Sequence, residues 1–156
     1  MRREDLNHDL RDLIFDFFFR FSRFESALKE RGFLQWEKPG DKAAPSWRKF
    51  AAEHRAAYEP NAAALALIEA RPKIQVIGDN GELDFVDEQI ADNVAAIDRV
   101  ITYAHTVRNN LFHGGKHGGD GWDNPDRMRL LLKSTIGVLD DFADRGQFGS
   151  DYSGDY

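Results

Sequence analysis

The chain has 156 residues, of which 42% are hydrophobic and 31% charged, so it is long and apolar enough for one globular domain with its own core. The absence of cysteine excludes a disulfide framework, thiolate catalysis and thiolate metal ligation. The formal net charge of −6 argues against a protein that coats nucleic acid nonspecifically.

The first predicted element is a long amphipathic helix that ends at Gly32. Its apolar residues recur at steps of three and four for about six turns. They are Leu6, Leu10, Leu13, Ile14, Phe17, Phe21, Phe24 and Leu28. Phe15, Phe18 and Phe19 widen the apolar surface beyond one stripe, which predicts burial on two sides, inside a bundle or against a second subunit.

The apolar stretch at residues 13–21 is predicted to be neither a signal peptide nor a membrane span. It contains Asp16 and Arg20, follows an acidic N-terminus and has no cleavage-site pattern. The sequence therefore predicts a cytoplasmic protein.

Two shorter helices are expected next. A loop marked by proline and glycine at residues 39–40 leads to Ser46, a suitable N-cap. The short helix after this cap contains three apolar residues, Trp47, Phe50 and Ala51. Pro60 separates it from an alanine-rich helix at residues 61–70.

A small β-hairpin is predicted near residues 73–86, because two strand-like runs flank the turn sequence at residues 78–81. A long helix should follow from about Asp87 and end near His113, with Gly114 in a left-handed cap. Its apolar stripe consists of Ile90, Val94, Ile97, Ile101 and Ala104.

The last predicted helix begins after Asn124 and Pro125, a pair typical of an N-cap and first turn, and ends at Gly146. Its apolar stripe consists of Met128, Leu131, Leu132, Thr135, Ile136, Leu139 and Phe142. The sequence thus predicts an all-α domain over residues 1–146 and a disordered acidic tail over residues 147–156.

Arg108 occupies a position where the helical stripe calls for an apolar residue. A bare guanidinium is costly to bury, so this arginine should have a carboxylate partner or line a cleft or interface that an anion can enter. Glu25, and Glu4 or Asp5, could supply the carboxylate.

Arg108, Asn109 and His113 combine a fixed cation, a polar neighbour and a proton carrier, which suit phosphodiester cleavage without a metal. On a straight helix, His113 lies about 140° around the axis from Arg108. The end of the helix is therefore expected to let the imidazole turn back toward Arg108. The alternative is a core arginine paired with a carboxylate and a histidine that merely ends a helix.

At these residues the chain resembles the HEPN family, small all-helical domains with an Arg-x(4–6)-His signature and a polar residue usually just after the arginine. Arg108, Asn109 and His113 match this signature at its shortest spacing. Residues 20–29 also resemble the opening helix of bacterial proteins of this group, and the resemblance covers roughly residues 6–145. It implies an antiparallel bundle of four to five helices that forms a homodimer, with the motifs of two protomers in one cleft.

The resemblance further implies a metal-independent endoribonuclease that produces 2′,3′-cyclic phosphate ends, and a role as a toxin or defence effector. Arg108 would stabilise charge at phosphorus, His113 would transfer a proton, and Asn109 would orient the phosphate or the histidine. An antitoxin or regulatory protein on another chain would be its partner. The alternative is a noncatalytic HEPN-like module that binds a nucleotide, an RNA or a partner protein through dimerisation.

Residues 108–133 carry five Lys or Arg and three Asp, a net charge of +2, which fits brief contact with RNA. We expect Lys116, His117 and His105 to contact the strand, although His105 fits a solvated helix surface equally well. His113, His117 and Asp120 have conceivable metal spacing, but the glycines between them provide no rigid frame. We therefore expect no metal site and no cofactor.

Overall fold

The computed structural model describes residues 8–113 and 124–154. Its elements are α1 (His8–Glu30), α2 (Trp47–His54), the 3₁₀ helix η2 (Arg55–Ala57), α3 (Ala62–Ala70), β1 (Lys73–Ile77), β2 (Leu83–Asp87), α4 (Ala96–His113), α5 (Pro125–Arg145) and α6 (Gly149–Ser153). A mostly helical chain with one small antiparallel sheet agrees with the predicted all-α class and hairpin. Within the described ranges, no helix combines the length and apolar character needed to cross a membrane.

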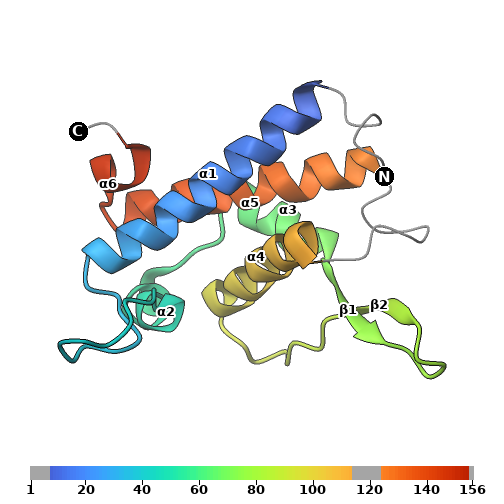
Figure 1. Ribbon diagram of the computed structural model, residues 1–156, viewed down its shortest axis with the longest axis horizontal. Helices are drawn as coiled ribbons and strands as arrows, with labels where there is room; N and C mark the ends of the chain where they lie inside the picture. Colours follow the sequence, from blue (N-terminus) through green and yellow to red (C-terminus); the bar gives the residue numbers. More distant parts are fainter. Residues whose placement is uncertain (1–7, 114–123, 155–156) are drawn as a thin grey trace.

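The helices pack in two layers, with α1 and α5 side by side and α3, α4 and α2 beneath them (Figure 1). α1 and α5 run in the same direction, because residues later in α1 contact residues later in α5. Arg20 pairs with Asp140, and Phe24 lies 6.1 Å from Phe142 between ring centroids. α4 runs opposite to α1 (Figure 1). The helix directions are thus mixed, and the predicted antiparallel arrangement is wrong for α1 and α5.

Side-chain caps set the start of three helices, as the sequence predicted for two of them. The Ser46 hydroxyl accepts from the backbone N–H of Lys49 at 3.3 Å. Asn124 accepts from the backbone N–H groups of residues 126 and 127 at the start of α5. Asn61 caps α3 in the same manner, a role the sequence analysis did not assign. Each cap satisfies donors that the first helical turn leaves without an intrahelical partner.

The core is centred on aromatic rings, with Phe24 at its middle. The Phe24 ring lies 4.7 Å from Trp47, 5.4 Å from Phe148 and 5.6 Å from Phe50, measured between centroids. Phe24, Phe50 and Phe148 have no exposed surface. Burial of each such ring contributes about 1.5–3 kcal/mol relative to exposure. This cluster joins α1, α2 and the C-terminal segment, so it fixes the frame on which α4 packs.

The C-terminal segment differs from the predicted disordered tail. Phe148 is fully buried, and α6 packs on α1. The Tyr152 hydroxyl donates to Asp140 Oδ1 at 2.6 Å, and Arg31 Nε lies 2.8 Å from Asp151 Oδ2. The prediction of disorder is therefore wrong for residues 147–154. Polar and glycine residues dominate the segment, and its single large apolar anchor provides no periodic signal.

The α4 helix begins at Ala96, nine residues later than the predicted start at Asp87. β2 extends to Asp87, where it pairs with Lys73, and residues 88–95 form a connecting turn. Ile90 packs on the core from this turn, so its match to the helical period is coincidental. The helix ends at His113, as predicted, and Gly114 lies outside the described residues.

Candidate functional site

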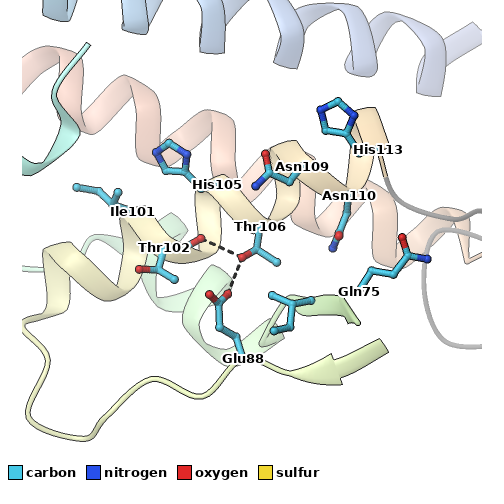
Figure 2. A pocket seen from close by; sticks show the side chains of 10 residues that line it. Gln75, Glu88, Ile101, Thr102, His105, Thr106, Asn109, Asn110 and His113 are labelled. Atoms are coloured by element: carbon cyan, nitrogen blue, oxygen red, sulfur yellow. Dashed lines mark hydrogen bonds between the residues drawn. The ribbon is translucent and has the colours of Figure 1, made fainter. Parts of the chain in front are cut away.

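A pocket of about 510 Å³ runs along α4, and we call it the α4 pocket (Figure 2). Residues four apart share one face of a helix, so two neighbouring rows of α4 line it. One row is His105, Asn109 and His113, and the other is Thr102, Thr106 and Asn110. The rest of the lining is Ile74, Gln75, Glu88 and Ile101. The structure therefore brings two of the three predicted catalytic residues, Asn109 and His113, to one cavity.

Arg108 lies beside this pocket and does not line it. Its Nη1 donates to Asn109 Oδ1 at 3.1 Å. Its Cζ lies 5.4 Å from the centroid of the Phe112 ring, within the range of a cation–π contact. Because Asn109 does line the pocket, its amide connects the guanidinium to the cavity.

The carboxylate partner expected for Arg108 is not found among residues 8–113 and 124–154. Glu25 instead accepts a hydrogen bond from Trp47 Nε1 at 3.2 Å. Glu4 and Asp5 lie outside these ranges. In the described part of the chain, the charge of Arg108 is thus available to an anion from outside.

His113 is exposed at the last position of α4 and lines the end of the α4 pocket (Figure 2). Its ring centroid lies 6.4 Å from that of Phe112. The imidazole contributes to the pocket, whereas the Arg108 guanidinium remains outside its lining. The expected turn of His113 toward Arg108 is therefore not the arrangement within one chain.

His105 is not on a solvated helix surface. Its ring packs edge-on against Trp47 at 4.8 Å and Phe21 at 5.9 Å between centroids. Burial, and to a lesser extent the nearby Arg108 charge, lowers the pKa of His105 to about 4. The ring is therefore neutral at pH 7 and cannot attract phosphate through charge. It can still offer a hydrogen bond to a ligand in the pocket.

Two predicted contacts cannot be placed. Lys116 and His117 lie outside the described residues, as does Asp120 from the conceivable metal set. In the part of the chain that the structure describes, no group of three or more metal-ligating side chains comes together.

The second row of α4 holds residues that sequence reasoning missed. The Thr106 hydroxyl donates to Glu88 Oε2 at 2.6 Å, and the Thr102 carbonyl oxygen lies 3.1 Å away as an alternative acceptor for the same proton. Asn110 donates through Nδ2 to the Lys73 carbonyl at 2.7 Å. These contacts fasten the hairpin and the turn after it to α4. The sequence signal for this second polar row was the four-residue spacing of the polar residues at positions 102, 106 and 110.

Four phenylalanines of α1 and α4 are exposed, and one of them, Phe112, contacts Arg108; we call these four the aromatic face. Phe15, Phe18, Phe19 and Phe112 are 68%, 48%, 42% and 49% exposed. The Phe18 and Phe112 rings lie 5.9 Å apart between centroids, which connects α1 to the end of α4. The predicted burial of the α1 phenylalanines on two sides does not occur within one chain.

Comparison with known proteins gives no match. No protein-family model, no curated protein and no solved structure matches this chain. The HEPN resemblance therefore remains a prediction based on the motif and its place at the end of α4.

Proposed function

We propose that this protein is a metal-independent endoribonuclease of the HEPN type that acts as a homodimer. The observation that carries the proposal is the 3.1 Å hydrogen bond from Arg108 to Asn109. It connects a guanidinium without a carboxylate partner in the described chain to a pocket that Asn109 shares with His113. A cation, an amide and an imidazole at the end of one helix are the groups that metal-free RNA cleavage requires.

The proposed reaction is an internal transesterification of RNA. The ribose 2′-oxygen attacks phosphorus, the bond from phosphorus to the 5′-oxygen breaks, and the products are a 2′,3′-cyclic phosphate and a 5′-hydroxyl. His113 accepts the 2′-hydroxyl proton or donates a proton to the leaving oxygen. Arg108 stabilises the charge that develops on the phosphoryl oxygens, and the Asn109 amide group orients the phosphate.

A second copy of the chain completes the site in this proposal, because His113 lines the α4 pocket and Arg108 does not. The aromatic face next to Arg108 supplies apolar surface for the contact. A two-fold contact there would bring the ends of two α4 helices together, since isologous interfaces use the same patch on both subunits.

An assay with excess chelator tests the chemistry. Purified protein should cleave single-stranded RNA in EDTA, and a substrate with 2′-deoxyribose at the cleaved position should resist, because it lacks the attacking group. Cleavage that needs Mg²⁺ or Mn²⁺, or that proceeds on the 2′-deoxy substrate, contradicts the mechanism.

Mixing two inactive variants tests the shared site. If Arg108 and His113 act from different chains, subunits carrying Arg108→Ala and His113→Ala should recover part of the activity when they form heterodimers. If both residues act from the same chain, no complete site exists in the mixture and activity stays absent.

The second candidate is a noncatalytic module that binds a nucleotide, an RNA or a partner protein through dimerisation. The observation that favours it is the α4 pocket itself, which has the size of a small-molecule site. Under this alternative, RNA binds and remains intact in the chelator assay.

A further inference from the structure

The charges around the α4 pocket are unequal along its length. Among the described residues that line it, Glu88 is the single carboxylate, and none is Lys or Arg. His105, farther from the helix end, is neutral at pH 7 because burial lowers its pKa to about 4. A phosphate is therefore repelled near Glu88, and this part of the pocket suits a neutral ligand with hydrogen-bond donors.

The hydrogen bonds already made in the pocket define what it offers a ligand. Glu88 receives the Thr106 hydroxyl on Oε2, which orients the carboxylate. Among residues 8–113 and 124–154, the oxygen of Asn109 receives Arg108 and its amide N–H groups have no partner, so they can donate to a ligand. Asn110 uses its N–H on the Lys73 carbonyl, and within the same ranges its oxygen can accept from a ligand.

The lining also offers apolar surface to a ring. Ile74 and Ile101 supply this surface. The volume of about 510 Å³ falls within the range of sites that hold a ligand of nucleoside size. A planar heterocycle with donors on one edge and acceptors on another matches these surroundings.

We propose that the α4 pocket binds a guanine base and that Glu88 is the residue that selects it. Guanine presents two adjacent donors, N1–H and the N2 amino group, which can pair with both sides of a carboxylate. Its O6 acceptor suits one amide N–H of Asn109, and the second N–H remains for the phosphate. Adenine places the lone pair of N1 in that position, and uracil and cytosine offer one donor group each. The inference rests on the proposed function, in which this base belongs to the nucleotide whose phosphate lies near His113.

Binding of nucleoside 5′-monophosphates tests the pocket without any cleavage. Isothermal titration calorimetry would compare GMP, IMP, AMP, UMP and CMP. Each of these carries a single 5′-phosphate and contains no phosphodiester. GMP should bind at least about tenfold more tightly than AMP, UMP or CMP, because each of these lacks the paired donors. IMP has N1–H and lacks the amino group, so its affinity should fall between those of GMP and AMP. Equal affinities, or tighter binding of AMP, overturn the proposal.

Substitutions locate the preference at Glu88. Glu88→Gln should reduce GMP affinity to about that of AMP, because an amide group replaces one carboxylate oxygen with a donor. Asp92→Asn is the matched control, because it removes one negative charge from the same turn and Asp92 does not line the pocket. This variant should keep the preference for GMP over AMP unchanged. Thr106→Val keeps the carboxylate and removes its orienting hydrogen bond, so it should weaken the preference partially. If Glu88→Gln unfolds, an unaltered preference in folded Thr106→Val contradicts the proposal.

Cleavage assays separate this inference from the proposed function. RNAs that differ only in one central nucleotide should be cut beside guanosine in preference to the other three. A protein that binds GMP selectively and leaves every RNA intact overturns the ribonuclease and supports the pocket assignment. A protein that cuts RNA in EDTA without base preference, and binds all five nucleotides alike, supports the ribonuclease and overturns guanine selection.

Discussion

The first part of α4 is buried, whereas its C-terminal end is displayed to solvent. Four apolar residues of the first part have no exposed surface, namely Ile97, Val100, Ala104 and Val107. At the end of the helix, Asn109, Phe112 and His113 are exposed. One continuous helix thus serves as core at one end and presents chemical groups at the other. Substitutions at the two ends should separate stability from activity.

The largest effect, a loss of RNA cleavage, is expected for substitutions at the exposed C-terminal end of α4. Arg108→Ala and His113→Ala should each reduce the rate of RNA cleavage by about 10²–10⁴, the usual cost of losing an acid, a base or a charge stabiliser. The melting temperature should change little, because these side chains contribute little to the core. Lys42→Ala, at an exposed position in the loop before α2, provides the control and should retain full activity. Parent-like cleavage by both motif variants would falsify the catalytic assignment.

The second prediction compares two phenylalanines of α1. Phe24→Ala should reduce the free energy of unfolding by about 3–5 kcal/mol, because it leaves a cavity in the middle of the aromatic core. Phe18→Ala, the same change at a half-exposed position, should cost about 1 kcal/mol or less. Urea unfolding of the two variants under identical conditions measures both values, and similar losses would show that Phe18 is also a core residue.

The third prediction uses the buried histidine of α4. The pKa of His105 is lowered to about 4 in the folded chain, below its ordinary value near 6.5. Between pH 6.5 and 4 the unfolded chain therefore binds a proton that the folded chain does not, and stability falls as the pH falls. Above pH 6.5 both states are neutral at this residue, and the effect is absent.

His105→Phe isolates this contribution from those of the carboxylates, which titrate in both proteins. The difference in unfolding free energy between parent and variant should change by up to about 3 kcal/mol from pH 7 to pH 4. Parallel pH profiles for the two proteins would show that the ring is solvated after all.

The smallest effect on stability is expected at the aromatic face. Phe18→Ser with Phe112→Ser should convert the proposed dimer to a monomer and lower the melting temperature only slightly, because both side chains are about half exposed. Light scattering measures the mass, with Leu130→Ser on α5, 45% exposed, as a matched control. A parent protein that is monomeric and fully active at the same concentration rules out the shared cleft.

Local signals were sufficient for most elements. The period of α1, the caps Ser46 and Asn124 and the hairpin turn before Leu83 each depend on residues close in sequence. The end of α4 at His113 was predictable for the same reason, since glycine follows it directly.

Features that depend on distant partners were not predictable. The neutral state of His105 requires Trp47, which lies on another helix. The order of the C-terminal segment requires a hydrophobic site for Phe148 between α1 and α2. Side-chain orientation was not predictable even among near neighbours: Arg108 contacts Asn109 and Phe112 and lies outside the lining of the α4 pocket. Sequence spacing placed the motif on the correct helix end but could not orient its side chains.

The pairing of α1 with α5 has a consequence for how the chain is made. Arg20 and Asp140, which join the two helices, are 120 residues apart in sequence. α1 is synthesised before α5, so the part of its apolar side that α5 covers stays exposed until α5 has been made. Such long-range contacts slow folding and expose hydrophobic surface in the meantime. The nascent α1, with its row of phenylalanines, therefore presents a hydrophobic surface of the kind that chaperones bind during synthesis.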